Sequence, residues 1–197
     1  MNVSIIVLIG LLGLGMVGQY KANKLTRQVE TPKYTVLGRY AQFEVRSYPE
    51  MIIATTSMGV GDYSSQSTKG FRTIASYIFG GNEENKKISM TAPVISSIED
   101  TMRMSFIMPA AYSLSELPQP NNKQVDLKVQ PERVMAVIRF GGFASNKDLK
   151  RYTALLQESL AAQGLDPSGK IYFQGYNPPF QLLNRTNEVA IEMINYE

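Results

Sequence analysis

The sequence of 197 residues contains no cysteine and no histidine. Without cysteine, the chain has no disulfide, no thiolate metal ligand, no cysteine nucleophile and no Cys-x-x-Cys-His attachment site. Without histidine, it has no Ser-His-Asp triad, no imidazole-bound zinc and no proximal imidazole for iron. These two absences exclude the kinds of metal binding and nucleophilic catalysis that depend on cysteine or histidine. With 44% hydrophobic residues, the chain is long enough to bury one sizeable core or two small ones.

An excess of charge is also missing from most of the chain. The formal net charge is +3, and it comes entirely from residues 21–33, so the charges of residues 34–197 cancel. Binding to a nucleic-acid backbone requires an excess of clustered Lys and Arg. The sequence therefore predicts no nucleic-acid partner.

One long hydrophobic run stands at the amino terminus. Residues 3–18 are uncharged, although at about 1.5 Å per residue a helix of this length is somewhat shorter than a hydrocarbon core of about 30 Å. We interpret residues 1–20 as an N-terminal transmembrane anchor, with residues 3–20 in contact with the membrane. A cleaved signal peptide is the alternative, but the run has no positive side chain before it and no well-placed small-x-small site after it.

The residues that follow the run predict how the chain is oriented. Lys21, Lys24 and Arg27 come directly after it, and positive residues favour the cytoplasmic side of a membrane. The expected localisation is a single-pass membrane protein whose domain faces the cytoplasm. Residues 21–33 are polar and lack apolar periodicity, which is typical of a tether, whereas residues 34–197 show a globular pattern.

The chain contains an internal repeat with an offset of 82 residues. Residues 43–59, FEVRSYPEMIIATTSMG, align with residues 125–141, VDLKVQPERVMAVIRFG. In each copy a charged, alternating strand reaches a Pro-Glu turn, and an apolar strand follows and ends at glycine. The Pro-Glu pair, one alanine and the final glycine stay in register. We therefore predict a duplicated half-domain, over residues 43–108 and 125–194.

Each copy continues with a helical pattern and then with two more strands. Apolar residues at i, i+3, i+4 and i+7 predict a helix over residues 71–78, and a second helix should start at Ser145 or Asn146 and end at Gly164. The further strands are expected at residues 86–95, 102–108, 170–176 and 188–194. Two such ββαββ halves predict an α+β fold of eight strands and two helices, either a closed or distorted barrel or two sheets face to face.

Five stretches carry the pattern of a known family. They are KISMTAPV (87–94), MSFIMP (104–109), ELPQPNNKQVDLK (116–128), RFGGFASNKD (139–148), and GYNPPF with RTNEV (175–180 and 185–189). In this order and spacing they resemble the SOUL haem-binding family over residues 34–197. The resemblance implies a distorted eight-stranded antiparallel β-barrel flanked by two α-helices and built from duplicated ββαββ halves. The family is in turn similar to bacterial effector-binding domains, which use the same duplicated half for small amphipathic ligands.

For function, the resemblance implies non-covalent binding of haem or a related tetrapyrrole in an apolar cleft. The chain has no histidine, so the ligand would be held without a histidine ligand. No pair of residues is spaced to act as general acid and base, and we expect a membrane-anchored carrier, buffer or sensor rather than an enzyme. The alternative is an effector-binding-like domain for another amphipathic small molecule or for a protein partner, which the sequence does not identify.

The resemblance also points to cofactor-binding residues, because in the family the first helix and the neighbouring strands line the cleft. Apolar side chains would contact the macrocycle, and basic side chains on or near the same helix would meet its propionates. The six candidates are Lys69, Phe71, Arg72, Ile74, Ile78 and Met90. Another interpretation stays open for each, since apolar stripes at helical spacing are more often core and helical cations are more often solvated.

Tyr176 lies in a Tyr-x-Pro-Pro turn that resembles the turn of the family, and it is the seventh candidate. A tyrosinate can ligate ferric haem, although an aromatic residue beside a Pro-Pro turn more often closes one end of a barrel. Arg185, Asn187 and Glu188 match the closing motif of the family. We predict that these three form an ion-pair and hydrogen-bond clip for the last strand. No metal-binding residues are predicted.

Overall fold

The structure is a computed structural model that describes residues 29–99, 101–194 and 196. The predicted anchor of residues 1–20 lies outside the described residues, as does most of the predicted tether of residues 21–33. Within the part of the chain that is described, no helix has both the length and the apolar character needed to cross a bilayer.

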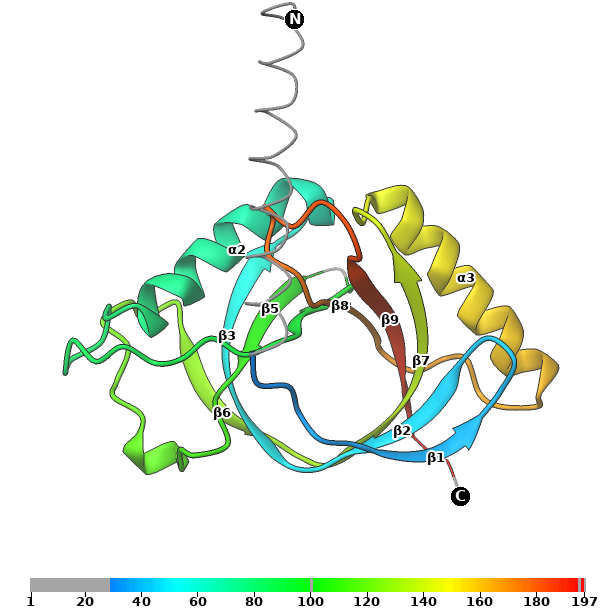
Figure 1. The fold of residues 1–197 in the computed structure, drawn as a ribbon, viewed down its shortest axis with the longest axis horizontal. Coiled ribbons are helices and arrows are strands. Elements are labelled where there is room, and N and C mark those ends of the chain that lie inside the picture. Colours follow the sequence, from blue (N-terminus) through cyan, green and yellow to red (C-terminus); the bar gives the residue numbers. More distant parts are fainter. Residues whose placement is uncertain (1–28, 100, 195, 197) are drawn as a thin grey trace, which may run out of the picture.

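A single antiparallel sheet curls round on itself and carries two helices on its outer side (Figure 1). In the described part of the chain it has nine strands, in the order β1-β2-β7-β9-β8-β4-β5-β3-β6. The strands are β1 (Thr35–Arg39), β2 (Glu44–Tyr48), β3 (Met51–Gly59), β4 (Val94–Ser97), β5 (Met102–Ile107), β6 (Asp126–Gln130), β7 (Arg133–Gly141), β8 (Ile171–Gly175) and β9 (Thr186–Met193). The two edge strands of this described sheet, β1 and β6, do not pair with each other, so the sheet is a half-barrel.

The two halves of the chain exchange their first strands. β2 comes from the first half and pairs with β7 of the second, while β6 comes from the second half and pairs with β3 of the first. The register is the same in both pairs, because Tyr48 lies opposite Arg133 and the equivalent residues of the other copy, Gln130 and Met51, also lie opposite each other. The Pro-Glu turns therefore send the chain from one half to the other and do not close hairpins.

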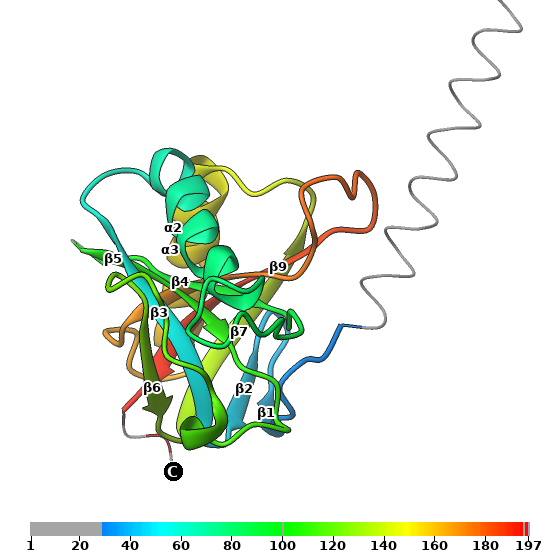
Figure 2. The same cartoon turned by 90° about the vertical axis from the view of Figure 1, so that its left-hand side faces the viewer.

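Two helices, α2 (Tyr63–Ile78) and α3 (Asn146–Ala162), cover the outer face of the sheet (Figures 1 and 2). Their amino-terminal ends meet where the two halves join. There the equivalent residues Ser64 and Asn146 bond to each other: Ser64 N donates to Asn146 Oδ1 at 3.3 Å, and Asn146 Nδ2 donates to Ser64 Oγ at 2.9 Å. Ser145 is the N-cap of α3, since its side chain accepts from the amide of Asp148.

The sheet separates two kinds of apolar packing. On its outer face, Ile74 and Ile78 of α2 pack against β3 and β5, and Leu156 and Leu160 of α3 pack against β7 and β9. The inner face carries a smaller apolar set of Tyr48, Ile53, Ile95, Ile107, Met135 and Val137. β3 and β7 are thus buried on both faces, which is why their sequences are mostly apolar.

The structure corrects the predicted fold in four places. α2 begins at Tyr63 and not at residue 71. The sheet of the described residues is an open half-barrel rather than the predicted barrel, because its edge strands β1 and β6 do not pair with each other. It has one strand more than the eight predicted, because β1 lies at the edge of the sheet, has no counterpart in the repeat and buries none of its side chains fully. The strand predicted at residues 86–95 is mostly wrong, because β4 begins only at Val94. Before it, the side chain of Asn82 binds the backbone of Lys86 at 2.8 and 3.0 Å, and Pro93 has no amide to donate to a ladder.

We expect Gly169→Ala to destabilise the protein. Gly169 precedes β8, and a Cβ at this position would collide with the carbonyl oxygen of Glu192 in β9. Overpacking of this kind should lower the free energy of unfolding by about 1–3 kcal/mol, as measured by urea denaturation. Gly141→Ala is the control, since its Cβ would lie at an ordinary 3.5 Å from the carbonyl oxygen of Arg185. Equal stability of the two variants would contradict this packing.

Candidate functional site

The predicted apolar residues around α2 fall into two layers. Ile74 and Ile78 have no exposed surface and belong to the core beneath the helix. Phe71 is half-buried, with its ring centroid 5.2 Å from that of Phe106, and Met90 packs half-buried against the same core. A ligand can therefore touch Phe71 and Met90 from outside, whereas Ile74 and Ile78 hold the helix against the sheet.

Lys69 and Arg72 form a basic edge on the exposed side of α2. Three positions separate them, so their side chains leave neighbouring parts of the helix surface. Both are exposed, and neither forms an ion pair with a described residue. α2 therefore carries two exposed cations and the half-buried ring of Phe71. An apolar ligand with carboxylates along one edge needs this combination.

Tyr176 is separate from the α2 group and belongs to the inner side of the sheet. Its hydroxyl donates to Glu188 Oε2 at 2.7 Å. Burial, reinforced by the charge of Glu188, raises the pKa of Tyr176. The phenol therefore stays protonated and acts as a hydrogen-bond donor, which disfavours the phenolate that would ligate ferric iron. The structure does not bring Tyr176 together with the other six candidates.

Glu188 is the centre of a buried charge cluster. It has no exposed surface and accepts hydrogen bonds from Arg46 Nη1 at 3.1 and 3.2 Å and from Arg139 Nε and Nη2 at 3.0 and 2.9 Å. Arg46 is also buried and stacks on the ring of Tyr34 at 4.4 Å. Burial lowers the pKa of Arg46, but Glu188 and Tyr48 outweigh this effect, so its pKa is raised and its charge is fixed. The cluster joins β2, β7 and β9.

The predicted clip of the last strand is present only in part. Asn187 takes part in it, since its Nδ2 donates to the carbonyl oxygen of Gly142 at 2.8 Å. Glu188 also takes part, but its partners are two distant arginines and not Arg185. Arg185 instead donates to the carbonyl oxygens of Pro178 and Gln181, both at 2.7 Å, and so shapes the loop between β8 and β9. Motif analysis missed Arg46 because 142 positions separate it from Glu188, and only the exchange of β2 brings the two together.

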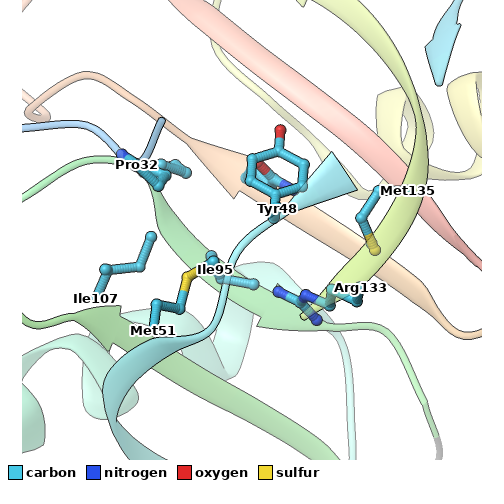
Figure 3. A pocket seen from close by; sticks show the side chains of 9 residues that line it. Pro32, Tyr48, Met51, Ile95, Ile107, Arg133 and Met135 are labelled. Atoms are coloured by element: carbon cyan, nitrogen blue, oxygen red, sulfur yellow. The ribbon is translucent and has the colours of Figure 1, made fainter. Parts of the chain in front are cut away.

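A small pocket lies on the inner face of the sheet (Figure 3). Six of the side chains that line it are Tyr48, Met51, Ile95, Ile107, Arg133 and Met135. Including its open mouth the hollow measures ≈ 230 Å³, of which the centre of a water molecule can occupy ≈ 10 Å³, about the space of one ordered water. This pocket is too small for a tetrapyrrole, so the outer surface of α2 is the better candidate for a ligand of that size.

We expect Glu188→Ala to destabilise the fold strongly. Removal of the carboxylate takes away the fully buried partner of Arg46 and leaves it only the partly exposed Glu44, which lies 2.9 Å from its Nε. Breaking a buried pair from one side costs about 3–5 kcal/mol. Arg139→Ala is the matched control. The Arg139 side chain is 59% exposed, and Glu188 keeps its bonds to Arg46 and Tyr176, so this variant should lose at most about 1 kcal/mol. Urea denaturation measures both losses, and equal losses would show that burial does not govern the cluster.

Comparisons of the sequence with known proteins point to one family. A family model described as SOUL heme-binding protein matches residues 29–192. The chain is 33% identical to Heme-binding protein 2 of Homo sapiens over 156 residues, which are 75% of this chain and 76% of that protein. It is 24% identical to Heme-binding protein 1 of Sus scrofa over 187 residues, 88% of this chain and 97% of that protein.

The fold is also similar to a solved structure, the crystal structure of the EcmrR C-terminal domain. The TM-score is 0.60 at 13% sequence identity, with 77% of this chain and 96% of that chain covered. At this identity the likeness concerns the fold alone. Because the family model spans most of the chain and the human relative is similar over three quarters of it, the chain belongs to the SOUL heme-binding protein family.

Proposed function

We propose that this protein binds haem or a related tetrapyrrole non-covalently beside α2, as a carrier, buffer or sensor and not as an enzyme. The observation that carries the proposal is membership of the SOUL heme-binding protein family over residues 29–192. The names of the human and pig relatives state the same ligand. Since the chain has no histidine, binding would come from apolar contact and charge pairing and not from an imidazole–iron bond.

The proposed site is the outer surface around Phe71 and Met90. Both side chains are half-buried against a packed core, so they would present a firm apolar surface to a flat ligand. Lys69 and Arg72 would pair with the two propionates at its edge. The site therefore combines an apolar face with a basic rim.

The three remaining candidates support this site indirectly. Ile74 and Ile78 hold α2 in place, because both are fully buried in the core beneath it. Tyr176 holds Glu188 on the inner side of the sheet and would not touch a ligand on α2. Substitution of these residues should act through stability, whereas substitution of the basic rim should act on ligand affinity.

Apolar burial is large enough to give binding without an iron ligand. Roughly 600 Å² of macrocycle buried at about 25 cal/mol per Å² contributes a gross stabilisation of ~15 kcal/mol. Association costs about 4–15 kcal/mol. The net affinity therefore ranges from negligible to tight, and the pairing of the propionates with cations decides where in this range it lies.

Titration of the full-length protein with hemin tests the proposal. We expect a saturable change of the Soret band, and a dissociation constant at least about tenfold weaker in the Lys69→Gln/Arg72→Gln double variant, because two charge-assisted contacts are lost. The matched control is Lys147→Gln/Arg151→Gln, which removes two exposed cations from α3. Arg151 occupies the repeat position equivalent to Lys69, so the control changes charge by the same amount on the other helix.

Two results would contradict the haem proposal. A linear response without saturation up to tens of micromolar hemin would show that no specific site exists. Equal weakening by the two double variants would show that net charge matters and the position of the cations on α2 does not. Native mass spectrometry of the purified protein is an independent measurement, since a co-purifying mass of another amphipathic molecule would favour an effector-binding-like function.

The amino-terminal run supports a second proposal, attachment to a membrane. Residues 3–18 are uncharged and almost entirely apolar, and they lie outside the described residues. We expect deletion of residues 1–20 to move the protein from the membrane fraction to the soluble fraction of a cell lysate, as measured by immunoblotting against the full-length protein. An unchanged distribution would contradict the anchor.

A further inference from the structure

The loop between β8 and β9 turns its apolar side chains outward. Phe180 is 59% exposed, and Leu182 and Leu183 are each 63% exposed. Phe143, in the loop between β7 and α3, is 57% exposed and lies beside them, because Arg185 of the first loop stacks on its ring with 4.3 Å from Cζ to the centroid. We call Phe143, Phe180, Leu182 and Leu183 the apolar tip. Large apolar side chains gathered on one surface mark a contact site.

Two polar side chains of the same loop, residues 176–185, point inward. Gln181 is 2% exposed, and its amide donates to the carbonyl oxygen of Leu183 at 3.1 Å. Arg185 donates to the carbonyl oxygens of Pro178 and Gln181, both at 2.7 Å. These bonds hold both polar side chains against the backbone of the loop while its apolar side chains face outward, which is the reverse of the arrangement that water favours. The loop therefore suits an apolar surrounding better than water.

The internal repeat shows that the scaffold does not require this loop. β4 and β5 of the first copy are the equivalents of β8 and β9, and only residues 98–101 connect them. Their sequence, IEDT, is short and carries two acidic residues, whereas residues 176–185 are longer and carry none. The apolar connection of the second copy is therefore a feature that folding of the half-domain alone does not explain.

The chain enters the domain at the same end of the sheet. Glu30 lies against the segment before β4, since the amide of Ala92 donates to the carbonyl oxygen of Glu30 at 2.9 Å. β4 starts at Val94, which pairs with Gly175, the last residue of β8 before the loop. Figure 2 shows the loop (orange) and the first described residues (blue) on the right-hand side of the molecule. The entry of the chain and the apolar tip therefore share one side of the domain.

The length of chain before this point limits the distance between the domain and a membrane. The apolar run proposed as the anchor ends at Gly18, and residues 19–29 span at most about 40 Å when fully extended. The domain would thus be held close to the bilayer by the side that carries the apolar tip. Neither residues 176–185 nor residues 139–147 contain an acidic residue that an anionic lipid headgroup would repel.

We propose that the apolar tip inserts into the surface of a lipid bilayer and so fixes how the domain sits on the membrane. Apolar side chains of proteins that lie on a membrane are buried about 5–10 Å into the boundary between headgroups and acyl chains. This proposal rests on the membrane attachment proposed above and names the surface of the domain that meets the membrane. The apolar tip shares no residue with the haem site proposed on α2.

Spin labelling of the full-length protein in phosphatidylcholine nanodiscs tests this proposal. The chain has no cysteine, so a nitroxide attaches only where a cysteine is introduced. Leu182→Cys places the label in the apolar tip, and Ile194→Cys places it on an exposed apolar position after the last residue of β9. The ratio of the collision rates of the label with oxygen and with aqueous Ni-EDDA should be at least about threefold higher at position 182, because oxygen concentrates in the acyl-chain boundary and Ni-EDDA is excluded from it.

The outcomes separate the apolar tip from the anchor. Co-elution of the protein with nanodiscs, together with equal ratios at positions 182 and 194, would overturn insertion of the tip and leave the anchor in place. A full-length protein that does not co-elute with nanodiscs would overturn both. A ratio that rises in liposomes holding many copies, but not in nanodiscs holding one, would assign the tip to contact between two copies of the chain and overturn the proposal.

Two double variants assign the insertion to the apolar side chains of the loop. In the Leu182→Cys protein, Phe180→Ser/Leu183→Ser should lower the collision ratio to that of the Ile194→Cys protein. The matched control is Val60→Ser/Ile194→Ser, which removes two exposed apolar side chains from the loop after β3 and the end of β9 and should leave the ratio unchanged. Both variants should keep the same melting temperature, because all four side chains are exposed. A ratio that Phe180→Ser/Leu183→Ser leaves unchanged would overturn the assignment.

Discussion

The exchange of first strands between the two halves is the constraint on which the rest of the structure depends. β2 completes the sheet of the second half and β6 that of the first, so neither half has a complete sheet alone. The helices are left to cover the outer face, where their amino-terminal ends meet at Ser64 and Asn146. The same exchange carries Arg46 from β2 to Glu188 in β9. The buried charge cluster is therefore a product of the topology.

Duplication of the half-domain also allows equivalent positions in the two copies to take different roles while the strand pairing stays the same. Met51 and Arg133 share one register, but the first packs and the second places a cation in the inner pocket. On the outer face, α2 carries the half-buried Phe71 and the exposed Lys69 and Arg72. The sheet thus keeps two chemically different surfaces apart.

Sequence patterns predicted the local structure and the architecture better than the contacts between distant residues. Helical periodicity and capping by Ser145 depend on neighbouring residues, and the structure contains both helices and this cap. The repeat can also be read directly from the sequence, and its equivalent residues Ser64 and Asn146 meet in the structure. β1 was missed because an edge strand needs no apolar face. Strand exchange and the pairing of Arg46 with Glu188 were missed because nothing local encodes a contact across 142 positions. Of the candidate site, Lys69 and Arg72 are exposed, which agrees with both the ligand-binding and the solvated interpretation of these residues. The role of Tyr176 depends on its buried partner Glu188, which no local pattern encodes.

Strand exchange also has a consequence for how the chain acquires its structure during synthesis. While the ribosome makes the first half, β2 has no partner, because β7 (Arg133–Gly141) has not yet emerged. β3 likewise lacks β6 on its open edge until Gln130 has been added. Contacts of such long range are slow to form, since the entropy of closing a long loop opposes them. The nascent amino-terminal half therefore exposes strand edges until β6 and β7 have been synthesised, and a chaperone that shields such edges would act at this stage.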